Sequence, residues 1–200
     1  MGRTSDARER ILEHAQQLFH ERGYHAVGIS DICAAADVNK GSFYHFFRSK
    51  QQLALDVIDD VWHCVRDEME AQLLGDQPPR ERLRSYCEQL HATHSCCCEQ
   101  SGQELGCALA NLGVEMATQD TVLRERIASA FDSQIGYFER LVRDGQQRGE
   151  IDVAIQPRRA AEAFFAFVEG KIMLAKLRDG ADTLSDLYPE AERLLGFRPA

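Results

Sequence analysis

Residues 39–47 have the sequence NKGSFYHFF and indicate a short helix that begins after Asn39, a residue type that caps helix N-termini well. At about 100° per residue, one side of this helix carries three rings that we expect to pack inward: Phe43, Phe46 and Phe47. The opposite side is expected to face solvent and carries small or hydrogen-bonding residues: Gly41, Tyr44 and His45. Lys40 and Ser42 flank this exposed face.

Two further helices are predicted directly upstream. The first ends at Gly23, which suits the left-handed position after a helix, and its apolar stripe consists of Ile11, Leu12, Ala15, Leu18 and Phe19. Ser30 is a good N-cap for the second helix, and Asp37 and Val38 form the turn that follows it. A packing helix followed by two short helices around a tight turn is the outline of a helix-turn-helix.

The exposed face of the 40–46 helix suits DNA. Glycine permits close approach of the backbone, Lys40 supplies a cation near the helix start, and Tyr44 and His45 can hydrogen-bond or stack. A helix lying in the major groove requires such residues. A solvated polar face is the alternative, but it leaves the glycine on the outer side of so short a helix unexplained.

The composition of the 200-residue chain, 44% hydrophobic and 28% charged, is that of a soluble globular protein. No stretch approaches the roughly 18 apolar residues that a membrane span needs, and the N-terminus lacks the apolar core of a secretory signal. Seven cysteines, three of them consecutive at positions 96–98, indicate free thiols in a reducing compartment. We therefore expect a cytoplasmic protein without a membrane partner.

The net charge of −9 is unevenly distributed. Residues 1–50 hold seven lysines and arginines against six acidic residues, whereas residues 51–200 hold 16 against 26. A near-neutral head on an acidic body is expected if only the head meets a polyanion.

Apolar residues recur at helical spacing almost throughout, so the fold is predicted to be all-α. A helix from Ser49 to about Leu74 continues out of the head, and further helices are predicted at about 80–95, 103–118, 121–147, 157–179 and 184–195. We expect a three-helix DNA-binding unit over residues 1–50 and a larger helical domain over residues 51–200.

Three segments resemble the DNA-binding region of TetR-type transcriptional regulators: 18–24 (LFHERGY), 28–32 (GISDI) and 38–50 (VNKGSFYHFFRSK). The resemblance implies that the 51–200 domain binds a small-molecule effector and forms a homodimer. Two recognition helices spaced by about 34 Å then read a palindromic operator in double-stranded DNA. By family habit the chain would be a repressor, and no cofactor is expected.

The resemblance also implies which residues meet DNA. The recognition helix would contribute Lys40, Gly41, Ser42, Tyr44 and His45, and phosphates would be held at helix N-termini by Ser30 and Lys50. Two positions depart from the family pattern. Asp37 stands where glycine is frequent, and aspartate tolerates unusual backbone angles. Cys33 stands where alanine is usual, and we interpret it as a packing residue.

Two apolar stripes could form either the core or a dimer interface. The stripe of the 121–147 helix consists of Leu123, Ile127, Phe131, Ile135, Phe138 and Val142. That of the 157–179 helix consists of Phe164, Val168, Ile172 and Ala175. Gly170 permits close approach of another helix, and the resemblance implies that these two helices pair with their symmetry mates as a four-helix bundle.

The helix expected over 103–118 is apolar on two sides, which indicates a central position. One stripe consists of Leu105, Leu109, Leu112 and Met116, and the other side carries Cys107, Asn111 and Val114. Cys107 and Asn111, one turn apart, would line any cavity there. The run GCALANL at 106–112 resembles a TetR subgroup that responds to electrophiles such as quinones, reactive aldehydes and maleimides, in which a cysteine at this place is the sensor.

Cys107 has an alternative interpretation as a small buried filler, because reactivity requires a helix N-terminus or an activating partner in space. A thiol-based redox or metal sensor is a second alternative, with His91 and His94 near the cysteines at 96–98. Adjacent residues project in different directions, which disfavours a tetrahedral metal site, and we expect an exposed, oxidisable loop.

A cysteine-dependent enzyme is the remaining alternative. It would leave the head unexplained, and the sequence offers no Ser-His-Asp order, phosphate loop or HExxH pair.

Overall fold

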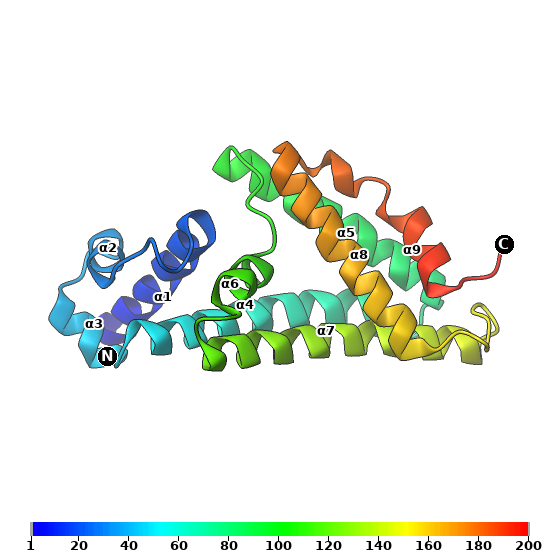
Figure 1. Ribbon diagram of the computed structural model, residues 1–200, viewed down its shortest axis with the longest axis horizontal. Coiled ribbons are helices and arrows are strands. Elements are labelled where there is room, and N and C mark those ends of the chain that lie inside the picture. Colours follow the sequence, from blue (N-terminus) through cyan, green and yellow to red (C-terminus); the bar gives the residue numbers. More distant parts are fainter. Residues whose placement is uncertain (1, 200) are drawn as a thin grey trace. The chain divides into compact units, whose positions relative to one another are not determined.

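The computed structural model describes residues 2–199, with side chains from residue 6 onward. These residues form helices joined by loops, and their β-structure is limited to one bridge between Ile151 and Phe197 (Figure 1). The elements are α1 (Gly2–Arg22), α2 (Ile29–Ala35), α3 (Lys40–Phe46), α4 (Lys50–Leu73), α5 (Pro79–Ser101), α6 (Ala108–Met116), α7 (Thr121–Gln147), α8 (Pro157–Arg178), the 3-10 helix η1 (Ala181–Leu184) and α9 (Leu187–Leu195). The predicted all-α fold is confirmed. Within the described residues, no helix has the length and apolar character to cross a bilayer.

The chain forms two compact units, and neither is continuous in sequence. The first contains residues 1–63 and 108–129, and the second contains residues 64–107 and 130–200. The prediction of domains at 1–50 and 51–200 treated each as a single stretch, whereas the long helices α4 and α7 each contribute to both units. The functional division at residue 50 stays a prediction.

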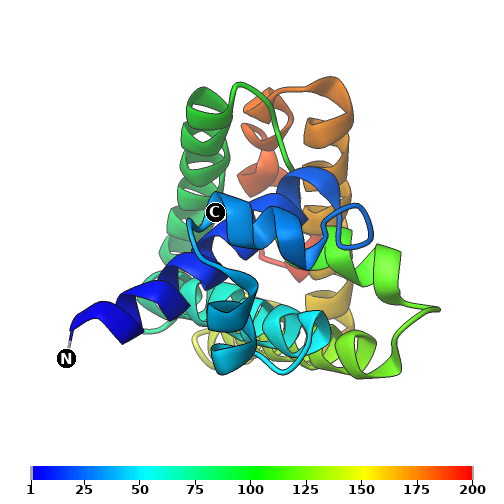
Figure 2. The ribbon, with the colours of Figure 1, turned by 90° about the vertical axis from the view of Figure 1, so that its left-hand side faces the viewer.

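The core of the first unit lies where α1, α2 and α3 pack against one another (Figure 2, dark to light blue). It consists of side chains that are less than a tenth exposed: Ile11, Ala15, Leu18, Phe19, Val27, Ile32, Cys33, Ala36, Phe43 and Phe47. Gly23, at φ +82°, ends α1 in the left-handed conformation, and its N–H donates to the carbonyl of Phe19 at 3.0 Å. The predicted terminator of the first helix is therefore found. Four of the five predicted stripe residues lie in this core, whereas Leu12 is half-buried.

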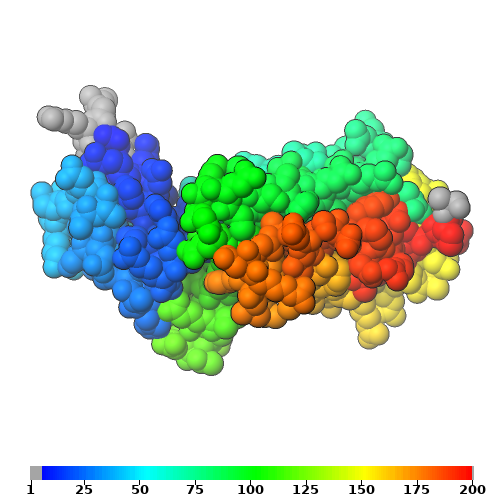
Figure 3. All heavy atoms as spheres, turned by 90° about the horizontal axis from the view of Figure 1, so that it is seen from above, coloured from blue at the N-terminus to red at the C-terminus, as the bar shows by residue number. Residues whose placement is uncertain are grey.

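In the second unit, η1 and α9 pack against α5 and α8, and the orange-to-red segment forms a continuous surface in Figure 3. Three rings meet edge to face inside it, with Tyr86, Phe138 and Phe164 at centroid distances of 4.8–6.3 Å. Such contacts add to the energy of burial. Arg82, on the same helix as Tyr86, is also buried. Its guanidinium donates to the Leu73 carbonyl at 2.7 Å and to the Asp144 carboxylate at 3.0 Å.

The apolar stripes on α7 and α8 belong to the core of the chain. Nine of their ten residues are less than a tenth exposed: Leu123, Ile127, Ile135, Phe138, Val142, Phe164, Val168, Ile172 and Ala175. Phe131 is half-buried and lies against Phe165 at a centroid distance of 5.0 Å. The alternative of an intramolecular core is therefore the correct one for these side chains.

The boundaries of α5 and α6 differ from the prediction. α5 continues to Ser101, where Gly102 at φ +75° ends it. α6 begins at Ala108 rather than near residue 103. Gly106, at φ +76°, is also left-handed, and two such glycines within five residues prevent the helix from starting earlier. Residues 102–107 are therefore a connecting loop.

Candidate nucleic-acid interface and thiol cluster

Burial of two rings orients α3. Phe43 and Phe47 have no exposed surface, and their ring centroids are 5.8 Å apart. The predicted N-cap is confirmed, because Asn39 Oδ1 accepts a hydrogen bond from the Ser42 N–H at 2.8 Å. The helix is thus held at its start by a cap and along its inner side by aromatic packing.

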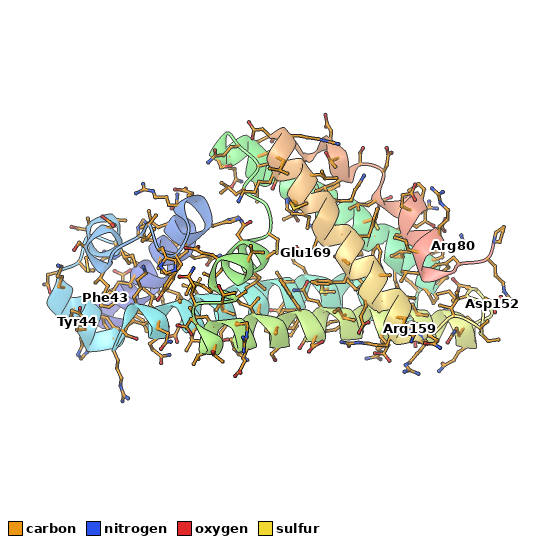
Figure 4. The ribbon with its side chains drawn as sticks, in the orientation of Figure 1. Phe43, Tyr44, Arg80, Asp152, Arg159 and Glu169 are labelled. Atoms are coloured by element: carbon orange, nitrogen blue, oxygen red, sulfur yellow. The ribbon has the colours of Figure 1, made fainter. Side chains whose placement is uncertain are left out.

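The opposite face of α3 is open to solvent. Lys40, Gly41 and His45 are exposed. Tyr44 is 56% exposed and is labelled in Figure 4. Ser42 is half-buried because its backbone and hydroxyl both contact Asn39. The structure therefore brings the predicted recognition residues together on one short helix.

Phe46 does not pack inward as predicted. It is only half-buried, and its ring lies edge to face with His45 at a centroid distance of 4.8 Å. The helix ends at Phe46, and Phe47 has an extended backbone at φ −127° and ψ 122°. Two of the three rings that were predicted to pack inward, Phe43 and Phe47, therefore do so.

The turn before α3 depends on an aspartate. Asp37 has φ +51°, the left-handed conformation that glycine often supplies at this position, and the Val38 N–H donates to the Cys33 carbonyl at 3.0 Å. Aspartate adopts this conformation more readily than most residues, so the departure leaves the turn intact. Cys33 is 5% exposed, and burial raises the pKa of its thiol, which fits a packing role.

Ser30 is not the N-cap of α2. The cap is Gly28, because the Asp31 carboxylate reaches back and accepts the Gly28 N–H at 2.7 Å. Ser30 lies exposed in the first turn of α2.

Lys50 is engaged inside the first unit. Its ammonium donates to the Tyr24 carbonyl at 2.5 Å and lies 4.0 Å from the centre of the Tyr24 ring. Burial lowers the pKa of Lys50, although Glu115 and Asp31 act in the opposite direction. A phosphate contact by Lys50 would require it to exchange this internal hydrogen bond, and that contact stays a prediction.

A carboxylate on α6 clamps the loop after α1. The two oxygens of Glu115 accept the backbone N–H groups of Tyr24 and His25, each at 2.8 Å. A Cβ at Gly23 would lie 3.0 Å from the same carboxylate, so the glycine serves both the left-handed turn and this approach. Sequence reasoning missed this contact, and the only signal was an acidic residue in an otherwise apolar helix.

Cys107 directly precedes α6 and is half-buried, so it does not lie in the first turn of a helix as predicted. Its thiol hydrogen-bonds the carboxylate of Glu169 on α8, a residue that sequence reasoning did not single out. Asn111 is half-buried on α6, whereas Val114 is 83% exposed. α6 is therefore not apolar on two buried sides, and Cys107 and Asn111 do not share a helix face.

The loop before Cys107 is anchored by Glu104, which is 5% exposed. Its carboxylate bonds His94 Nδ1 at 2.9 Å and accepts the Gly106 N–H at 2.8 Å, while its own N–H donates to Asp179 at 3.0 Å. The backbone that positions Cys107 is therefore held by hydrogen bonds to a buried side chain.

The residues at 96–98 lie in the last turns of α5 and not in a loop. Cys96 and Cys97 are exposed, and burial raises the pKa of the Cys97 and Cys98 thiols. Within the described part of the chain, no three His, Cys, Asp or Glu side chains are grouped so as to hold a metal ion. The seven cysteines, all within that part, are free thiols.

Comparison with known proteins gives the family. Residues 11–57 match the model of the bacterial regulatory proteins of the tetR family, and residues 79–188 match the tetracyclin repressor-like C-terminal domain. The chain belongs to the TetR family of transcriptional regulators and is not an enzyme.

Individual relatives cover nearly the whole chain. It is 30% identical over 185 residues to the HTH-type transcriptional repressor DhaR of Mycobacterium sp. strain GP1, covering 92% of this chain and 89% of DhaR. It is 24% identical over 191 residues to the repressor NemR of Escherichia coli K12, covering 95% and 94%. A TetR transcriptional regulator from Chloroflexus aurantiacus has a similar structure, with a TM-score of 0.85, 29% identity and complete coverage of both chains.

The Glu115 clamp can be tested by Glu115→Ala. Loss of two hydrogen bonds to a carboxylate leaves two backbone N–H groups without their partner and is expected to lower the free energy of unfolding by about 2 kcal/mol. Urea unfolding followed by circular dichroism measures the change. Glu125→Ala, at an exposed position on α7, is the matched control and should leave the midpoint unchanged. Equal midpoints for the two variants would show that the clamp contributes nothing.

Proposed function

We propose that this protein is a homodimeric repressor that binds a palindromic operator through α3 and is released from it by a small-molecule effector. The observation that carries the proposal is the exposed face of Gly41, Tyr44 and His45, backed by the fully buried rings of Phe43 and Phe47. Such a helix can enter the major groove without rearrangement of its core. Since its target is DNA, we assign its site of action to the cytoplasm.

Lys40 tests the DNA contact. Lys40→Ala is expected to weaken operator binding and to flatten the dependence of log K on log salt by about one per subunit, since each phosphate neutralised releases counterions. Fluorescence anisotropy with labelled promoter DNA at 50–200 mM salt measures both quantities. Lys176→Ala, which removes the same charge from an exposed position on α8, should change neither. An unchanged slope in Lys40→Ala would remove Lys40 from the interface.

An exposed apolar face of α8 supports the homodimer. Four residues at spacings of three and four share this face: Ala166, Gly170, Met173 and Leu177. Met173 is 56% exposed and Leu177 is 74% exposed. A Cβ at Gly170 would meet nothing within 4 Å in the chain. Large apolar side chains aligned around a glycine are typical of a helix that packs closely against a partner.

The dimer can be broken by charge on this face. Leu177→Glu is expected to yield a monomer and to lose tight operator binding, because one recognition helix contacts only half of a palindrome. Multi-angle light scattering gives the mass. Val153→Glu alters an equally prominent apolar residue, 75% exposed in the loop before α8, and should remain dimeric. A dimeric Leu177→Glu would place the interface elsewhere.

We further propose that the effector is an electrophile that adds to Cys107. The hydrogen bond to the Glu169 carboxylate supports this role, since it places a group that can accept the thiol proton next to Cys107. The name and sequence similarity of NemR support only the broader role of repressor.

Cys107→Ser tests electrophile sensing. The variant is expected to bind operator normally but to lose release by N-ethylmaleimide or benzoquinone, because a hydroxyl is a far weaker nucleophile than a thiol. Anisotropy after timed exposure measures release. A Cys96→Ser/Cys97→Ser variant removes two exposed thiols and should still be released. Release of Cys107→Ser at the rate of the unmodified protein would contradict the proposal.

A further inference from the structure

The pair formed by Cys107 and Glu169 joins two segments that are 62 positions apart in sequence. Cys107 ends the loop anchored by Glu104, and Glu169 projects from the middle of α8 (Figure 4). Both side chains are half-buried, and the thiol donates its hydrogen bond to the carboxylate. A nucleophile hydrogen-bonded to a group that can accept its proton is the arrangement used for covalent addition.

Tyr86 on α5 lies close enough to the pair to interact with both members. Glu169 and Cys107 act on its hydroxyl electrostatically, as do Cys87 on α5 and Glu68 on α4. Burial raises the pKa of Glu169 to about 7, and the hydrogen bond from Cys107 partly opposes that shift. Burial likewise holds the pKa of Tyr86 well above its usual value, so Tyr86 remains a neutral hydroxyl near the pair.

We propose that Glu169 is the general base that removes the Cys107 proton when the thiol adds to an α,β-unsaturated carbonyl compound. The inference rests on the sensing role proposed for Cys107 and extends it to a second residue.

The step conserves atoms and charge. A Glu169 oxygen takes the S–H proton while a sulfur lone pair forms the C–S bond to the β-carbon. The π electrons of the C=C bond move toward the carbonyl oxygen and leave an enolate. The protonated Glu169 then returns its proton to the α-carbon, which regenerates the carboxylate and leaves a saturated thioether. No oxidant or reductant is consumed. Until the electrophile bonds, the Cys107–Glu169 pair carries only the single negative charge of the Glu169 carboxylate.

The pH behaviour follows from the Glu169 titration. A base with a pKa of about 7 is half deprotonated at neutrality, becomes fully deprotonated above it and is matched to a proton transfer in this range. Below pH 7 the carboxyl group is protonated and the assistance is lost.

Glu169→Gln distinguishes a general base from a carboxylate that acts only by its charge, because the two roles predict opposite changes in the rate of Cys107 alkylation. A carboxylate that acted only by its charge would disfavour the thiolate, and its removal would speed up alkylation of Cys107. Loss of a base slows alkylation instead. We expect at least a tenfold decrease in the Cys107 rate at pH 7 and a smaller decrease at pH 6, where the Glu169 carboxyl group of the unmodified protein is mostly protonated.

The measurement uses the full chain, N-ethylmaleimide and quenched time points between pH 6 and pH 9, with each cysteine followed by peptide mass spectrometry. Cys96 and Cys97 are exposed internal references whose rates should not depend on Glu169. Glu162→Gln, at an exposed position on α8, is the matched control. Glu169→Asp retains a carboxylate and should recover part of the rate at pH 7, which a purely structural role would not produce.

The outcomes separate the two proposals. A Cys107 rate in Glu169→Gln that is unchanged or faster at pH 7 overturns the role of Glu169 and leaves Cys107 as the sensor. Absence of any Cys107 adduct in the unmodified protein overturns the sensing role as well. Native circular dichroism and operator binding of Glu169→Gln establish that a slower rate does not come from misfolding.

Discussion

Burial of the Phe43 and Phe47 rings is the constraint on which the exposed face of α3 depends. Both side chains are fully enclosed by the first unit, and together they leave α3 no freedom to rotate about its axis. The face that carries Tyr44 is exposed because exposing the opposite, apolar face to water would cost more free energy. The short helix is thus oriented by its apolar side, which leaves its polar side exposed.

Apolar packing holds α3 in place, whereas the carboxylates of Glu115 and Glu104 hold two loops in place through hydrogen bonds. Glu115 holds the loop after α1 through two backbone N–H groups, and Glu104 holds the loop that ends at Cys107. α6 lies between these two anchor points in sequence, with Cys107 before its first residue and Glu115 in its last turn. The last turn of α6 is thus tied to the loop after α1 within the first unit.

The recognition helix was predictable because its signals are local. Asn39 caps it, Phe43 faces inward, and Asp37 adopts the left-handed turn, all as the order of residue types indicates. Local patterns failed where a neighbouring residue changed the local geometry. Asp31 made Gly28 the cap of α2 in place of Ser30, and Phe46, predicted to pack inward, is half-buried at the end of α3. Gly102 and Gly106 moved the start of α6 beyond Cys107, although each is visible in the sequence.

The sequence by itself determined the helical class, the inner and outer faces of α3 and the family to which the chain belongs, since periodicity and short motifs encode each of these within a few residues. Only the tertiary structure decided that Lys50 is engaged with Tyr24, that the α7 and α8 stripes are core, and that Glu169 meets Cys107. Those facts depend on which segments come together in space, and contacts between residues dozens of positions apart leave no periodic trace in a single sequence.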